Sequence, residues 1–529
     1  LIECSTKKGH PLNADMLHSV LLPIRLSQRD YVWTIYINGL SYDEERVFQL
    51  IDQFHHGDML DGLSEDNTHL LLILFTWLLT SSNRHLRDIA SKGSIELLKN
   101  KFSLCLPLLQ KFETVNDPYV IQRLFGVIFG ACMKRVNKER GHFRELVDHI
   151  YQTIFNQDNV YPDVMLRDYA RLIIERWIYE YPDDCEFIDQ TMIVPPYKST
   201  AIPTVEKQTY YQQGEKHRGF NAIDNSMTIN HKECPGMYGD FGRYTFQAAL
   251  ESFKDVDVVE MYHYAMQYIR DELGYDEELF GNYDTYFLGR SYNRHANRKV
   301  ERIGKKYQWI ALYNVLARVS DVYQLSRWDE EPRRFEGPWN PYIRDFDPTL
   351  NRHFLRSDIL PGFNYPQLSE ELFLEIEPLP NKRTISEWNH GDTMFYSSLN
   401  SKLMYNDKEG NTWIVLKLYE CVKNKHHDID GHSIGFTKGS QEIWHMEHGL
   451  FMRKGEFEEN KQYLKKINFT GRHFPEGSDV YQLFNREYAW SSGMEDVFGT
   501  YWFDHEIEVG EKRKKTNPQN ARFCVSREW

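Results

Sequence analysis

The sequence is poor in the residues and motifs that would assign a chemistry directly. Its 529 residues include only seven cysteines, an odd number, and no two of them stand in CxxC spacing. This disfavours a disulfide framework or a zinc knuckle and indicates reduced thiols in a cytoplasmic protein. A Gly-x4-Gly-Lys-Ser/Thr loop for nucleotide phosphates is also absent. We expect no cofactor in this segment and favour a non-enzymatic role.

Long apolar runs and net positive charge are missing as well. The longest apolar run, from Leu70 to Leu79, is interrupted by Thr76 and is too short to cross a bilayer. The formal net charge of -14 disfavours nucleic acid as a partner, because a nucleic-acid coat needs a cationic surface. No signal peptide is present and the chain opens on Leu1 rather than Met, so we interpret it as either a fragment or a trimmed chain. No membrane partner is expected.

Hydrophobic residues are plentiful, at 41%, and aromatic residues reach 14%, which predicts packed cores rather than disorder. We expect a mainly α protein, with a HEAT-like α-solenoid followed by a helical domain and a smaller α+β C-terminal domain. The expected segments are an entry segment of uncertain class (1–66), HEAT-like helical repeats (67–195), an irregular linker (196–238), a helical domain with a basic helix (239–330), and a Pro/Trp-rich connection leading into the α+β domain (331–529).

The repeats are predicted from a recurring pair of amphipathic helices between Asn67 and Tyr181. The second helices of successive pairs align at Arg87, Arg123 and Arg167, and each is followed three residues later by a small residue. These small residues, Ala90, Gly126 and Ala170, recur about every 40 residues, which is the period of HEAT-type pairs. Each pair buries only one face, so the pairs must stack, and a small residue lets neighbouring helices approach closely.

Two other stretches have predicted secondary structure. In the entry segment, the apolar run Tyr31–Ile37 fits either a strand or a buried helix. Near the C-terminus, 413–419 and 443–452 are predicted strands, the first in a hairpin with 394–405, and 456–467 is a predicted helix.

A basic run from Gly289 to Trp309 leads into a 3.6-period apolar stripe, Ile310 to Val319, which predicts a buried helix. We treat four of its cations as candidate partner-binding residues, either facing a partner or paired internally: Arg294, Arg298, Arg302 and Lys305. A different cluster, Arg344, Asp345 and Asp347, precedes Pro348 and is interpreted as an ion-pair corner that holds a loop.

The densest group of metal-type ligands is His426, His427, Asp428 and His432, which would bind a divalent ion if the side chains converged. Hydrophilic runs of this kind are more typical of an exposed turn between strands. The nearby sequence His445-Met446-Glu447-His448 has the wrong spacing for a helical zinc motif. On a strand, His445 and Glu447 share one face and His448 takes the other, so we interpret this group as structural.

Several motifs together resemble a known family. They are residues 166–171, 238–244 (Tyr-Gly-Asp-Phe-Gly-Arg-Tyr), 301–311 and 344–348. These motifs resemble the C-terminal part of large bacterial antiviral ATPases, the STAND or AVAST-like defence proteins, and the resemblance spans about residues 67 to 350.

The resemblance implies a sensor role. In such proteins an effector and a nucleotide-binding module precede a C-terminal region that recognises a phage protein and triggers assembly. The expected function is therefore recognition of a phage-encoded protein, with self-assembly as a further expectation. Two alternatives stay open: a metal-dependent hydrolase or nuclease with its site in the C-terminal α+β region, and a nucleic-acid-binding helical protein that uses the basic run.

Overall fold

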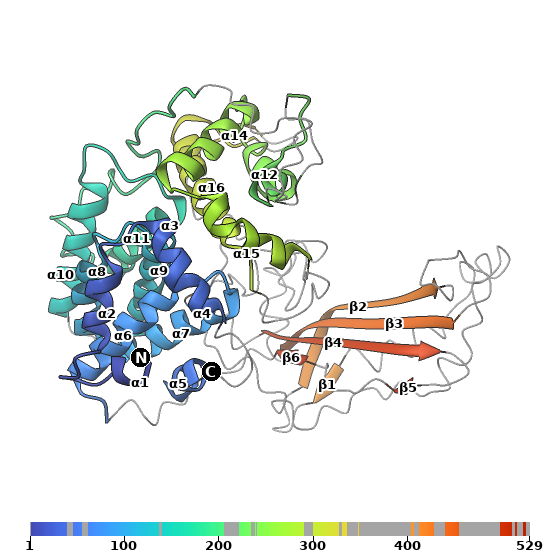
Figure 1. Cartoon of the computed structure of the whole chain (residues 1–529). Helices are drawn as coiled ribbons and strands as arrows, with labels where there is room; N and C mark the ends of the chain where they lie inside the picture. Colours follow the sequence, from blue (N-terminus) through green and yellow to red (C-terminus); the bar gives the residue numbers. More distant parts are fainter. Residues whose placement is uncertain are drawn as a thin grey trace. The chain divides into compact units, whose positions relative to one another are not determined.

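The computed structural model describes residues 2–39, 46–54, 62–136, 140–205, 222–233, 239, 241–289, 300–326, 331–335 and 348, together with the backbone of six strands between 404 and 524. The chain divides into two compact units, Leu1–Asn340 and Pro341–Trp529 (Figure 1). The described part is mainly helical, as the composition and periodicity predicted.

The first unit begins with short helices: α1 (Ile2–Ser5), α2 (Ala14–Leu21), α3 (Leu26–Arg29), η1 (Asp30–Thr34), α4 (Ile35–Gly39) and α5 (Arg46–Gln53). The stretch that fitted either a strand or a helix is helical. Its periodicity was ambiguous because apolar residues lie on both sides of the helix. Trp33 and Ile37 are buried, whereas Tyr31 and Tyr36 are each 50% exposed.

Longer helices follow in pairs: α6 (Glu65–Leu78) with α7 (Arg84–Asn100), α8 (Cys105–Phe112) with α9 (Pro118–Lys134), and α10 (Arg140–Ile150), extended by η4 (Tyr151–Phe155), with α11 (Val164–Glu180). A 3-10 turn, η3 (Phe102–Leu104), precedes α8. Side-chain oxygens of Ser64, Asp117 and Asp163 cap α6, α9 and α11, which explains where these helices begin.

The second helices of these pairs pack side by side: α7 contacts α9, and α9 contacts α11 (Figure 1). The first helices form another layer, in which α8 contacts both α6 and α10. Gly126 lies against the ring of Tyr169, and a Cβ at this glycine would be 3.0 Å from the ring. Ala90 and Ala170 are fully buried. The aligned small residues therefore lie in the packed layer, where close approach requires them.

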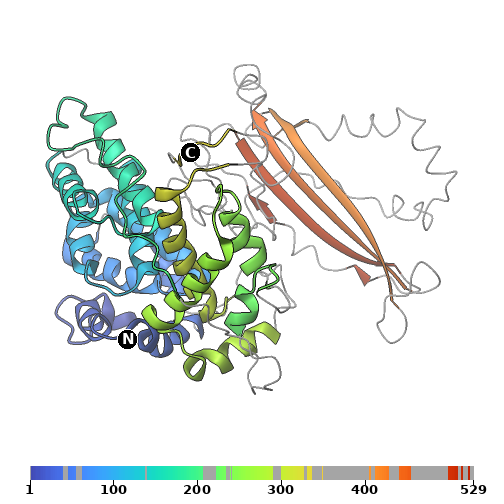
Figure 2. The same ribbon diagram turned by 90° about the horizontal axis from the view of Figure 1, so that it is seen from above.

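The remainder of this unit comprises α12 (Ala222–Met227), η5 (Gly242–Gln247), α13 (Ala248–Leu250), α14 (Val258–Gln267), η6 (Tyr268–Glu272), α15 (Glu277–Gly289) and α16 (Ile303–Val322). Helix α16 is the buried helix that the apolar stripe predicted, and nearly all of its residues are buried. It contacts α9 and α11 on one side and α12 to α15 on the other, so in Figure 2 it lies between the blue and teal helices and the green ones.

In the second unit, the structure describes β1 (Met404–Asn406), β2 (Thr412–His427), β3 (Ser440–Arg453), β4 (Phe498–Val509), β5 (Lys514–Lys515) and β6 (Arg522–Cys524). They form an antiparallel sheet in the order β1-β2-β3-β4-β5, and β6 also pairs with β4. The predicted strands 413–419 and 443–452 lie within β2 and β3. The helix predicted at 456–467 lies outside the described residues.

Candidate functional site

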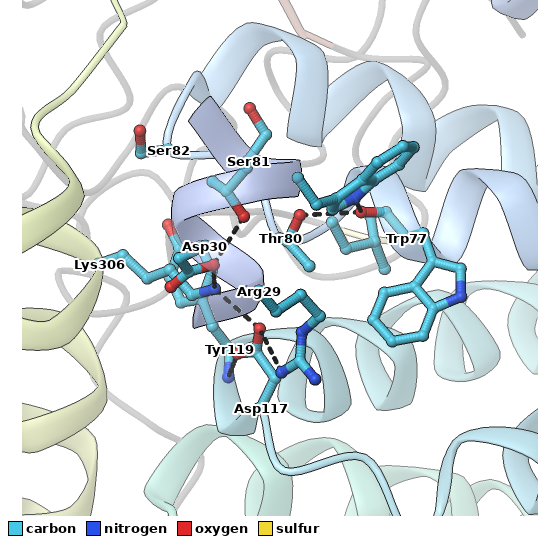
Figure 3. A network of polar contacts seen from close by, with 12 residues as sticks. Arg29, Asp30, Trp77, Thr80, Ser81, Ser82, Asp117, Tyr119 and Lys306 are labelled. Atoms are coloured by element: carbon cyan, nitrogen blue, oxygen red, sulfur yellow. Dashed lines mark hydrogen bonds and ion pairs between the residues drawn. The ribbon is translucent and has the colours of Figure 1, made fainter. Parts of the chain in front are cut away.

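Four charged side chains from distant parts of the sequence meet in the interior of the first unit. We call Arg29, Asp30, Asp117 and Lys306 the buried charge cluster; Figure 3 shows them converging. Arg29 ends α3 and Asp30 begins η1, Asp117 caps α9, and Lys306 lies in the first turn of α16. The cluster therefore joins the entry segment, the start of α9 and the first turn of α16.

The geometry is that of a closed ion-pair network. The Nζ atom of Lys306 lies 2.8 Å from Oδ1 of Asp30 and 2.7 Å from Oδ2 of Asp117. The guanidinium of Arg29 lies 3.5 Å from the same Asp117 oxygen. All four side chains have no exposed surface. Because two cations face two anions, the cluster as a whole is neutral.

Local structure positions three of the four members. The backbone N–H of Tyr119 donates to Oδ1 of Asp117. Pro118, which lies between them at the first helical position, has no N–H that needs a partner. The hydroxyl of Thr34, one helical turn after Asp30, donates to Asp30 at 2.6 Å. Arg29 donates to the carbonyl of Ile24 at 3.0 Å. Short-range contacts thus orient Arg29, Asp30 and Asp117, whereas Lys306 reaches the two carboxylates from α16.

Burial opposes ionisation of both carboxyl groups, and the outcome differs between them. Burial prevails at Asp30 and raises its pKa above the usual value, although Lys306 acts in the opposite direction. At Asp117 the attraction of Lys306 and then of Arg29 outweighs burial, so the pKa is lowered. Asp30 is therefore the member of the pair that protonates first as the pH falls.

A second set of polar contacts extends this junction. The amide of Asn38 donates to the hydroxyl of Ser82 at 2.8 Å and accepts from Ser81 at 2.6 Å. Ser82 in turn donates to the carbonyl of Glu301 at 2.7 Å. The turn between α6 and α7 is thereby tied to the residues just before α16. The charged atoms of the buried charge cluster have no access to solvent, and Oδ2 of Asp30 and the Nε and Nη2 atoms of Arg29 have no hydrogen-bond partner. The arrangement therefore joins segments of the chain and offers no open site to a substrate.

The two described members of the candidate partner-binding set lie inside the protein. Arg302 donates to the hydroxyl of Ser226 at 2.7 Å, and Lys305 lies 3.9 Å from a carboxylate oxygen of Glu301. Both residues are only 6% exposed. A partner-facing position does not fit this burial, because α16 packs on all sides from its first turn; these residues adopt the internal pairing instead. Arg294 and Arg298 lie outside the described residues.

Sequence reasoning missed the residue that matters most in this run. Lys306 is the last cation before the apolar stripe, and a lysine entering a buried helix must find a carboxylate. That signal was present, but it could not identify Asp30 and Asp117 as the partners, because they lie 276 and 189 residues away.

The other predicted site residues fall mostly outside the described part. Arg344, Asp345 and Asp347 do so, as do Asp428 and His432. The backbones of His426 and His427 end β2, opposite Gln441 and Ser440 of β3.

Residues 431–435 also have GxSxG spacing. A serine elbow needs a strand-to-helix turn, whereas this segment connects two antiparallel strands, β2 and β3.

Among the residues whose side chains are described, no three His, Cys, Asp or Glu side chains form a group able to hold a metal ion. The described helices include none that is both long and apolar enough to cross a bilayer. Cys4, Cys105, Cys132 and Cys185 are free thiols. No family model, curated protein or solved structure matches this chain.

Proposed function

We propose that this chain is the recognition region of a bacterial anti-phage defence protein and binds a phage-encoded protein through a helical-repeat surface. In this proposal, α6 to α11 form a HEAT-like α-solenoid and the C-terminal part forms a smaller α+β domain. The protein acts in the cytoplasm and the segment binds without catalysis or a cofactor of its own.

The observation that carries the proposal is the stacking of successive helix pairs. Arg87 in α7 donates to the carbonyl of Leu79 at 3.1 Å, and Arg167 in α11 donates to the carbonyl of Tyr161 at 2.7 Å. Each arginine thus reaches back to the chain preceding its own helix. The aligned Arg123 pairs with Asp88 of the preceding repeat at 3.1 Å. Arg87 also donates to the carbonyl of Tyr119 in the next pair at 2.7 Å, so the aligned position joins neighbouring pairs at Arg87 and Arg123.

The surface available to a partner is the part of α6 to α11 that other helices of this chain do not cover. Helix α16 lies on α9 and α11, so that side of the stack is occupied. In the opposite layer, α2 covers α6, whereas α10 and the end of α11 carry exposed residues. Tyr179, in the last turn of α11, is 77% exposed. Tyrosines are among the residues that most often dominate protein interfaces, because they bury a large area and lose little side-chain entropy.

The test is capture of a phage protein by the affinity-tagged full chain from infected cells, with uninfected cells as the reference. We expect a phage-encoded protein to be enriched, and Tyr179→Ser to weaken its binding at least about tenfold. The matched control is Tyr244→Ser in η5, since Tyr244 is 56% exposed and lies outside the repeats. Absence of any enriched phage protein, or equal losses in both variants, would contradict the proposal.

A further inference from the structure

Helix α2 packs on α6, the first helix of the stacked pairs (Figure 1). The buried residues of α2 are Ala14, Leu17, His18 and Leu21, which follow the i, i+3, i+4, i+7 pattern of one helix face. Three of these four residues are apolar. His18 is therefore the one ionisable side chain on the buried face of this helix.

The imidazole of His18 lies among aromatic rings. Its centroid is 4.8 Å from the ring centroid of Phe112 in α8 and 5.6 Å from that of Trp77 in α6. His18 is only 7% exposed, and its Nδ1 atom has no hydrogen-bond partner. A neutral imidazole fits this setting, whereas an imidazolium would bring a charge and a second N–H donor into it.

The ionisable groups that face His18 come from each of the packed helices. Lys111 of α8 pairs with Asp15 of α2 at 2.8 Å, and His69 of α6 is a second imidazole whose Nδ1 has no hydrogen-bond partner. Burial lowers the pKa of His18 to about 4, and the charge of Lys111 acts in the same direction, as does His69 to a smaller extent. The charge of Asp15 and a hydrogen bond to the backbone of Lys111 act in the opposite direction without cancelling these effects.

The remaining contacts of α2 hold mainly its C-terminal end. Arg29 donates to the carbonyls of Leu21 and Ile24, at 3.4 and 3.0 Å. The pair of Lys111 and Asp15 is partly exposed, and such surface pairs contribute little to stability. The first turns of α2 can therefore leave α6 and α8 while the chain stays attached after Leu21.

We propose that α2 is an acid-released cover of α6, and that protonation of His18 separates α2 from α6 and α8. Since the docked helix takes up this proton less readily than the released helix, a falling pH favours release. Histidine protonation at a packed interface is a general basis of pH switches. The proposal is independent of the recognition function, because the release needs no partner.

The experiment follows hydrogen exchange of the purified full chain from pH 7 to pH 5, corrected for the intrinsic pH dependence of exchange. A pKa of about 4 in the docked helix, against 6.5 for a free imidazole, should increase the opening constant of α2 about 20-fold over this range. At pH 5 the amides of α2 should open more often than those of α9, which shows that the release is local.

His18→Phe keeps an aromatic ring but cannot take up a proton, so it should remove most of the increase. The matched control is His142→Gln in α10, where the side chain is 47% exposed, and it should keep the full increase. The proposal is overturned if the opening constant of the wild-type chain rises less than about threefold. It is also overturned if His18→Phe keeps the full increase, or if α2 and α9 open together at pH 5.

A second measurement applies if circular dichroism shows that His18→Phe does not fold. In histidine NMR of the wild-type chain, one imidazole should titrate near pH 4, and Lys111→Gln should raise the midpoint of that signal. Titration of every imidazole above about pH 6, or midpoints that Lys111→Gln leaves unchanged, would contradict the proposal.

Discussion

Replacing Lys306 by methionine tests the buried charge cluster most directly. Methionine has nearly the same length and volume but no charge, so the substitution leaves Asp30 and Asp117 facing the single guanidinium of Arg29 in a site without exposed surface. Removing one partner of a buried ion pair costs about 3–5 kcal/mol. Asp30 already has a raised pKa and can take up a proton, so we expect the lower end, about 3 kcal/mol.

The same reasoning predicts how this cost depends on pH. Lys306 normally lowers the pKa of Asp30, so the substitution raises that pKa further. A carboxyl whose pKa is raised by folding contributes stability that is present at low pH and lost as the pH rises through the folded-state value. The destabilisation by Lys306→Met should therefore grow between acid and neutral pH. Urea unfolding followed by helical circular dichroism measures it, and hydrogen exchange in α9 and α16 localises it.

A double substitution separates charge from packing. In Lys306→Met with Asp30→Asn, the remaining pair of Arg29 and Asp117 is again neutral, so the double variant should be more stable than the sum of the two single changes predicts. Additivity within about 0.5 kcal/mol would refute the coupling. The control is Lys254→Met at an exposed site, where a change within about 0.5 kcal/mol is expected.

Two further predictions concern the helical unit. Burial raises the pKa of Asp163 to about 6, so the contribution of this carboxyl group to the free energy of unfolding should fall as the pH rises from about 4 to 6. Asp163→Asn keeps a capping side chain and should remove about 2–3 kcal/mol of that fall, as measured by urea unfolding at several pH values. Gly242→Ala should destabilise by more than about 2 kcal/mol, because its Cβ would lie 2.1 Å from the backbone oxygen of Met227. Gly281→Ala in α15 is the control, since its nearest neighbour would be Glu277 at 3.8 Å; we expect it to be neutral or to stabilise by up to about 1 kcal/mol. Similar losses at Gly242 and Gly281 in thermal unfolding would contradict the close-approach argument.

Local patterns predicted the helical elements well where one face is clearly apolar and a capping residue marks the start. Asp117 before Pro118 and Asp163 before Val164 are cases in which the cap and the first turn are visible in the sequence. The entry segment was ambiguous for a physical reason. Its helix buries Arg29 and Asp30 and exposes Tyr31 and Tyr36, which inverts the usual pattern.

The candidate sites depended more on long-range pairing. The basic run left open whether its cations face a partner or pair internally; Arg302 and Lys305 are buried, because α16 packs against helices on both sides. In the second unit, the sequence placed His445 and Glu447 on one face of a strand. Only the strand register placed His505 opposite His445.

By itself, the sequence determined that the described part of the protein is mainly helical, where most of the helices α6 to α11 begin and end, and that the stripe after the basic run forms a buried helix. These properties depend on periodicity and capping within a few residues of chain. Tertiary structure alone decided that Lys306 balances Asp30 and Asp117, that α16 packs on α9 and α11, and that His445 and His505 are at opposed strand positions. Each of these pairs distant segments, and no local pattern specifies which of many buried carboxylates or strands will become the partner.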